Sequence, residues 1–244
     1  MIKKIWKALI HLDFRYSMLI NGAINRFSQE IINFDKFEGN ELRPTLSPDE
    51  AIEFLSEELD EKQYKLFEST ALEFCVTNDY NVNGKRWNCV EHLIQHHELL
   101  FSSESIKYLE ALNNSYASIY KVSFLEDSSS IELSNMLKEN DVVTITGKKQ
   151  VSDLRGHQVV ATRVLRIETK SKVVHKISNT LLPLTKEMTE GSVHVVNFIL
   201  SQMNSAKHPS SLTQNDILLR KKMMIKEILE QWYLRSKREE VVYH

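Results

Sequence analysis

The stretch Tyr116-Ala-Ser-Ile-Tyr-Lys-Val-Ser-Phe-Leu125 decides the fold, because the pattern of the chain changes here from helical to extended. A second stretch of the same character follows at His157-Gln-Val-Val-Ala-Thr-Arg-Val-Leu-Arg-Ile167. Both stretches are rich in β-branched and aromatic residues and are bounded by Ser, Asp, Asn or Gly, which is typical of strands. We therefore predict a small β module between helical segments.

Further strand candidates lie close to these two, at residues 130–137, 142–146 and 176–184. Gly147 and Arg155-Gly156 mark turns between them. Five short strands of this kind are typical of a small antiparallel sheet or a partly open barrel. We assign residues 116–184 to this β module.

Helical patterns occupy the rest of the chain. The clearest local signal is Ser47-Pro48-Asp49-Glu50, where Ser47 and Glu50 form a capping box and Pro48 suits the first helical position. The predicted class is α+β, with a helical N-terminal half, the β module in the centre, and C-terminal helices. The segments are an N-terminal amphipathic helix with its connector (1–46), a helical segment (47–115), the β module (116–184), a helix (185–204), a linker (205–212) and a C-terminal amphipathic helix (213–244).

Composition excludes several classes. The 244 residues carry a net charge of −2, which gives no global attraction to nucleic acid or anionic lipid. Two cysteines, Cys75 and Cys89, cannot form a disulfide framework, so we expect a reducing, cytoplasmic location. The sequence has no nucleophile elbow, phosphate loop or dinucleotide fingerprint, and we lean towards a protein without enzymatic activity.

The N-terminus begins like a signal peptide, with Lys3 and Lys4 before apolar residues. Charged or polar residues, first Lys7 and His11, interrupt the apolar run too early for a signal sequence or a spanning helix. We expect no transmembrane segment here. A basic amphipathic helix could lie on a membrane, but we expect its apolar stripe to pack on the protein core instead.

Several runs resemble a group of uncharacterised bacterial proteins. They are Asp79-Tyr-Asn-Val-Asn-Gly-Lys-Arg86, Leu109-Glu-Ala-Leu-Asn-Asn-Ser-Tyr-Ala-Ser-Ile-Tyr-Lys-Val122, Val159-Val-Ala-Thr-Arg-Val164 and Leu182-Pro-Leu184. In that group a helical segment with an Asp-Tyr…Gly turn leads into a Ser-x-Tyr-x-Val strand. The resemblance covers about residues 62–186 and implies no catalytic residue. Some relatives carry a C-terminal cysteine-rich SEC-C-type zinc module, which is absent here because no cysteine follows Cys89.

Cys89, His92 and His96 are the candidate metal ligands. On a helix these positions share a face, and their side chains could give sulfur and nitrogen ligands to zinc. The spacing matches no established zinc pattern, and a buried Cys is often only a small apolar residue. We therefore expect no cofactor, with zinc as the alternative.

Nucleic-acid binding by the β module is a second candidate function. Tyr116, Tyr120 and Phe124 alternate onto one face of the first strand, and a stacking platform needs such aromatics beside basic groups. Aromatic residues on one face of a strand are also the usual core of a sheet. The candidate residues are Tyr116, Tyr120, Lys148, Lys149, Arg155, Arg163 and Arg166.

The last helix is a candidate surface for a partner. Its apolar stripe consists of Ile217, Ile225, Ile228, Leu229 and Trp232. Because a linker precedes it, this helix could bind a protein partner or pair with itself. The alternative is a C-terminal helix packed on its own domain. Our leading interpretation is a non-enzymatic protein-interaction or scaffold protein.

Overall fold

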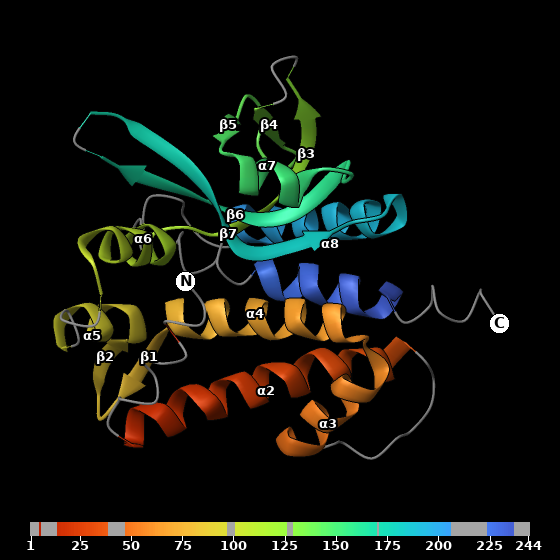
Figure 1. Ribbon diagram of the computed structural model, residues 1–244. Helices are drawn as coiled ribbons and strands as arrows, with labels where there is room; N and C mark the ends of the chain where they lie inside the picture. The colour runs from red at the N-terminus through yellow and green to blue at the C-terminus, as the bar shows by residue number, and fades with distance from the viewer. Residues whose placement is uncertain are drawn as a thin grey trace. The chain divides into compact units, whose positions relative to one another are not determined.

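The computed structural model describes residues 5, 14–38, 47–96, 101–125, 129–169, 171–205 and 224–236 (Figure 1). The chain divides into two compact units, residues 1–109 with 232–244, and residues 110–231. Three long helices dominate the first unit, and a five-stranded sheet dominates the second. The predicted α+β class is confirmed.

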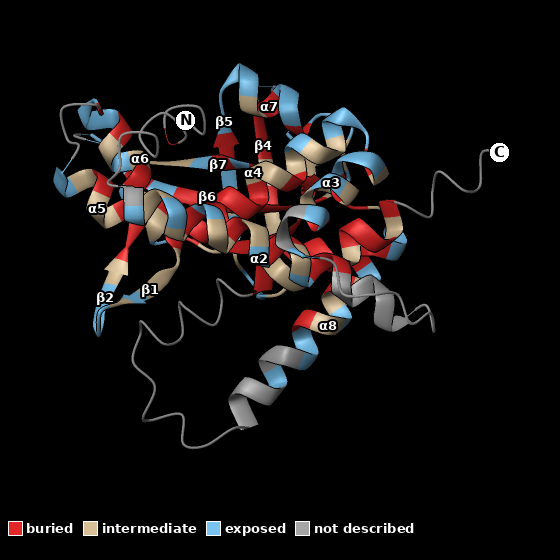
Figure 2. Ribbon diagram, turned by 90° about the horizontal axis from the view of Figure 1, so that it is seen from below, coloured by how far each residue is buried: buried red, intermediate tan, exposed pale blue. Residues whose placement is uncertain are grey.

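The first unit is built on α2 (Phe14–Glu38), α3 (Pro48–Glu58) and α4 (Glu61–Thr77), with α2 packed on both of the others. One stripe of α2 is buried because Ile20, Ile24, Phe27 and Ile31 recur at helical spacing. The ring of Phe27 lies 4.6 Å from that of Phe74 on α4, centroid to centroid. Figure 2 shows exposed and half-buried residues along α2, in pale blue and tan.

Capping boxes begin two of these helices. The predicted box at Ser47 is confirmed, since its side chain accepts from the amide of Glu50 and its own amide donates to the Glu50 carboxylate. Asp60 and Gln63 form a second box at the start of α4. The two boxes explain why α3 and α4 are separate helices with only two residues between them.

A hairpin that the sequence analysis missed follows α4. It consists of β1 (Asp79–Val82) and β2 (Lys85–Asn88), where we expected only a turn. Asn83 and Gly84 both have positive φ, 53° and 78°, as the tight turn of a two-residue hairpin requires. Helix α5 (Cys89–His96) begins directly after β2.

The second unit contains the sheet. Its elements are β3 (Ala117–Phe124), β4 (Ser130–Asn135), β5 (Val142–Thr146), α7 (Lys148–Leu154), β6 (Val159–Glu168) and β7 (Val173–Pro183). The strand order is β5-β4-β3-β6-β7, and every pair is antiparallel. β3 is central because its second half pairs with β4 and its first half with β6. The predicted strands are present, although β4 ends at Asn135 and β7 begins at Val173.

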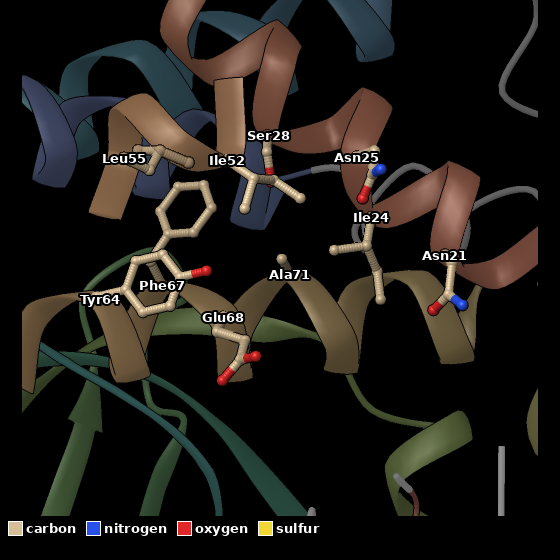
Figure 3. Close-up of a pocket in the computed structure, with 10 residues that line it drawn as sticks. All are labelled: Asn21, Ile24, Asn25, Ser28, Ile52, Leu55, Tyr64, Phe67, Glu68 and Ala71. Atoms are coloured by element: carbon tan, nitrogen blue, oxygen red, sulfur yellow. The ribbon is translucent and has the colours of Figure 1, made fainter. Parts of the chain in front are cut away.

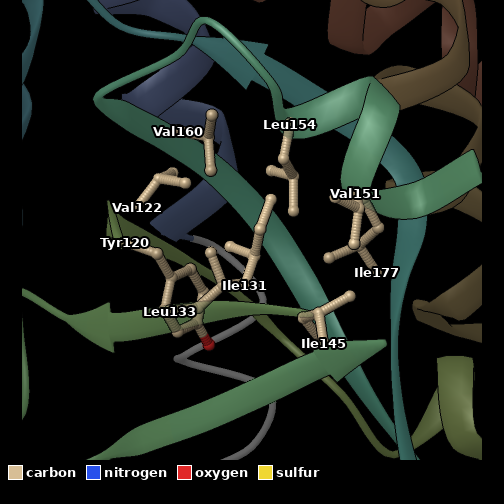
Figure 4. Close-up of a cluster of buried hydrophobic side chains, with 9 residues drawn as sticks. All are labelled: Tyr120, Val122, Ile131, Leu133, Ile145, Val151, Leu154, Val160 and Ile177. Atoms are coloured by element: carbon tan, nitrogen blue, oxygen red, sulfur yellow. The ribbon is translucent and has the colours of Figure 1, made fainter. Parts of the chain in front are cut away.

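This sheet resembles the partly open, five-stranded arrangement of an OB-fold. The edge strands β5 and β7 approach each other, and a helix lies between the third and fourth strands of the module. That helix, α7, was not predicted from the sequence. Its Val151 and Leu154 enter the core between the strands (Figure 4). The core consists of Tyr120, Val122, Ile131, Leu133, Ile145, Val151, Leu154, Val160 and Ile177.

Three further helices are described. α6 (Ser103–Asn113) leads into β3, α8 (Lys186–Ser205) follows β7, and residues 224–236 are helical. Within the described ranges, none of the helices combines the length and apolar character needed to cross a bilayer.

Candidate functional site

Two aromatic residues on the same side of β3 differ in their exposure to solvent. Tyr120 is 6% exposed and belongs to the core of the module, whereas Phe124 is 48% exposed. Both face the same way because side chains alternate along a strand. Phe124 is the last residue of β3, where the core ends, so its ring is available to a ligand.

The strand register relates Phe124 to two lysines. Phe124 is paired with Ile131 of β4, and Ile131 is paired with Ile145 of β5. β5 ends one residue later, and the chain passes through Gly147 into α7, which begins with the exposed Lys148 and Lys149. The exposed ring and the two ammonium groups therefore belong to the same end of the sheet.

Packing and a hydrogen bond fix the position of α7 and of the two lysines at its start. Its buried side chains enter the core, and the amide Nε2 of Gln150 donates to the carbonyl of Ile177 on β7 at 3.2 Å. Arg155, directly after the helix, is exposed and adds a third cation, while the exposed Asp153 offsets one of the three. By strand register Lys148 and Lys149 share the end of the sheet with Phe124, and Arg155 follows at the end of α7. We call these four residues the basic end of the module (Phe124, Lys148, Lys149 and Arg155).

Two of the predicted nucleic-acid residues are not available, which corrects the sequence analysis. Tyr120 lies in the core, where burial raises its pKa. Arg163 is 1% exposed, and its Nη1 donates to the carbonyl of Ser115 at 3.3 Å. Arg163 lies on β6 opposite Ala117, the first residue of β3.

The other members of that set differ in exposure. Tyr116 is half-buried, and its pKa is raised by burial and then by the negative charge of Asp141. Arg166 is exposed on β6 and forms an ion pair with Glu168 at 3.2 Å. Neither belongs to the basic end by strand register.

The structure does not bring Cys89, His92 and His96 together as metal ligands. Cys89 is fully buried, and burial raises the pKa of its thiol to about 12. The imidazoles instead contact aromatic rings: His92 lies 4.4 Å from His96 and 5.7 Å from Trp87, ring centre to ring centre. Within the described ranges, no group of three His, Cys, Asp or Glu side chains is placed to hold a metal ion.

The predicted partner surface of the last helix is buried within the chain. Ile225, Ile228, Leu229 and Trp232 are all buried, and Ile217 lies outside the described residues. Burial favours the alternative of a C-terminal helix packed on its own protein.

A cavity that no sequence pattern indicated lies between α2, α3 and α4 (Figure 3). Its volume is about 370 Å³, and its lining residues are Asn21, Ile24, Asn25, Ser28, Ile52, Leu55, Tyr64, Phe67, Glu68 and Ala71. One signal could have found part of it. Polar residues recur on α2 at positions 21, 25 and 28, on the edge of its apolar stripe.

Comparison with known proteins identifies a family but no activity. Residues 44–174 match the model of the "Family of unknown function (DUF7986)". No curated protein and no solved structure gave a match. The matched region runs from α3 to the start of β7, so it includes most of the β module and its basic end. Because it spans more than half of the 244 residues, the chain belongs to this family of unknown function.

Proposed function

We propose that this chain is a non-enzymatic binding protein whose β module binds single-stranded nucleic acid at the basic end. One observation carries the proposal: Phe124, an aromatic side chain exposed by 48%, shares the end of an OB-type sheet with Lys148 and Lys149. Single strands bind by stacking bases on aromatic rings while cations contact the backbone phosphates. OB-folds use their strand faces and neighbouring loops in this way.

The charge distribution supports a local site of moderate affinity. The whole chain has a net charge of −2, so attraction to a polyanion must be local, and the basic end is the cluster of cations that we propose for it. Such binding depends strongly on salt, because each phosphate contact releases counterions. The two free cysteines of the described chain support a reducing compartment, and we propose a cytoplasmic location.

The experiment is a fluorescence anisotropy titration of the full chain against a single-stranded uridine oligonucleotide of about ten nucleotides, within the usual site size of OB-folds. At roughly 50 mM salt, where electrostatic affinity is high, we expect saturable binding that weakens towards 200 mM. Replacing Lys148 and Lys149 together by Ala should lower the salt slope by about 1.4, because two phosphate contacts are lost. The matched control is the double replacement of the exposed Lys62 and Lys85 by Ala.

A second pair of variants tests how much the aromatic ring contributes to binding affinity. Phe124→Ala should weaken binding roughly 5- to 150-fold, the range for losing one stacked base. Phe198→Ala removes another exposed aromatic side chain, 59% exposed on α8, and should leave affinity unchanged. The proposal fails if the chain does not bind at low salt, or if each variant and its control lose affinity equally.

A protein partner or self-association is the second candidate function. Met136 and Val142 are exposed at the β4–β5 hairpin, and β5 is an edge strand of the sheet. Apolar residues exposed together can mark a surface that binds another protein. Sedimentation equilibrium tests this candidate: a dimer that Val142→Lys dissociates supports it, and a monomer at all concentrations removes self-association.

A further inference from the structure

The cavity between α2, α3 and α4 has an apolar floor. Ile24, Leu55, Phe67 and Ala71 are all buried and face it from the three helices. Its volume of about 370 Å³ falls within the range of small-molecule sites, roughly 300–1,000 Å³. All three helices belong to the helical unit, so the cavity does not depend on the β module.

Polar groups are arranged along two of its walls. On α2, Asn21, Asn25 and Ser28 recur at positions i, i+4 and i+7, and on α4 Tyr64 and Glu68 recur at i and i+4, so each set shares one side of its helix. Figure 3 shows the hydroxyls of Ser28 and Tyr64 directed between the helices, whereas the Glu68 carboxylate lies along α4 and is directed away from α2. Ser28 is buried, although a serine on a helix surface would ordinarily be exposed.

The charge of the lining residues favours a cationic ligand. Among the ten lining residues, Glu68 is the only one with a formal charge, and it is negative. Burial, and then the charge of Glu68, raises the pKa of Tyr64, so the phenol stays protonated and able to donate a hydrogen bond. An anion would be repelled by Glu68, whereas a cation would pair with this carboxylate and could also contact the face of the Tyr64 ring.

We propose that this cavity binds a small organic amine, with its apolar body on the floor formed by Ile24, Leu55, Phe67 and Ala71 and its ammonium group at Glu68 and Tyr64. The amide and hydroxyl groups of α2 supply further hydrogen bonds to polar substituents. This site is independent of the proposed nucleic-acid function, because it lies in a different unit and shares none of its residues.

The test uses phenethylamine as the probe, with two shape-matched comparisons: 2-phenylethanol, which is neutral, and 3-phenylpropionate, which is an anion. Binding to the full chain at pH 7 is measured by isothermal titration calorimetry and by saturation-transfer NMR. We expect the amine to bind and the alcohol and the acid to bind at least ten-fold more weakly, because only the amine forms a charge-assisted hydrogen bond.

Two conservative variants locate the site. Glu68→Gln keeps the shape and removes the charge, and should weaken amine binding about ten-fold or more, while Tyr64→Phe should weaken it less. The control is Glu57→Gln, an exposed position on α3 outside the lining. Amine binding that Glu68→Gln leaves unchanged, equal binding of the acid, or no binding of the amine at millimolar concentration would each overturn the proposal.

Discussion

Two thiols in the helical unit show how burial controls the chemistry of single residues. Cys75 on α4 and Cys89 at the start of α5 are buried, and burial raises the pKa of each thiol to about 12. A thiolate, not a thiol, is the reactive form. Both cysteines therefore remain protonated and inert at neutral pH, which fits a structural role.

This environment predicts a pH dependence of stability. In the unfolded chain the thiols ionise with an ordinary pKa near 9, whereas in the folded chain they ionise near 12. The unfolded state therefore loses protons first as the pH rises, and the free energy of unfolding should fall between about pH 9 and 12.

The measurement is urea unfolding across that pH range, with the Cys75→Ala/Cys89→Ala variant as the reference. The variant should be less stable at neutral pH but should show a weaker fall at alkaline pH. Rapid labelling of both thiols by a disulfide reagent in the native protein at pH 8 would contradict this account.

At the scale of elements, Asn88 joins the β1–β2 hairpin to the helices on either side. Its Nδ2 donates to the carbonyls of Thr77 and Asn78, both at 3.3 Å, and to the Asp79 carboxylate at 3.0 Å. Its Oδ1 accepts from the amide of Glu91 at 3.1 Å and so caps α5. One buried side chain therefore fixes the end of α4, the hairpin and the start of α5.

Asn88→Ala should destabilise the chain by about 1–3 kcal/mol, because it removes the cap and leaves buried carbonyls without a donor. Urea unfolding followed by circular dichroism measures the loss. Asn114→Ala is the control, since Asn114 is exposed and its side chain makes one bond, to the carbonyl of Glu110. Equal losses in the two variants would show that Asn88 is not the connecting residue.

The elements differ in how far the sequence predicted them. The Ser47 capping box and the strands rich in β-branched residues are local signals, and the structure has both. α7 has only seven residues, fewer than the roughly 11 residues over which helical periodicity is recognised. The hairpin strands Asp79–Val82 and Lys85–Asn88 are short and largely polar. These elements depend on tertiary contacts, such as the packing of Val151 and Leu154, that no local pattern contains.

The same reasoning applies to the candidate sites. The charge of Lys148 and Lys149 is enough to predict them as candidate residues. Tyr120 and Phe124 have the same strand periodicity, so the sequence does not show that Tyr120 is buried in the core and that Phe124 lies beyond it and is exposed. Only the polar positions 21, 25 and 28 of α2 form a local pattern at the cavity. The cavity as a whole could not be predicted, because its lining comes from three helices between residues 21 and 71.

At the scale of the whole molecule, the chain combines two units that each bury their own core. The helical unit has its own exposed or half-buried aromatic group, in which Tyr16 stacks on Trp87 with ring centres 4.8 Å apart. A nucleic acid could in principle stack there instead of on Phe124. Where the strand binds is therefore the central question about this protein.

Photocrosslinking shows most directly where the nucleic-acid strand binds. The full chain is irradiated with a single-stranded uridine oligonucleotide at roughly 50 mM salt, where electrostatic affinity is high, and the crosslinked peptides are identified by mass spectrometry. We predict that Phe124 crosslinks to the oligonucleotide and that raising the salt to roughly 200 mM suppresses this crosslink. Phe198 should not crosslink. Crosslinks confined to the helical unit, at Tyr16 or Trp87, or no crosslink at low salt, would contradict it.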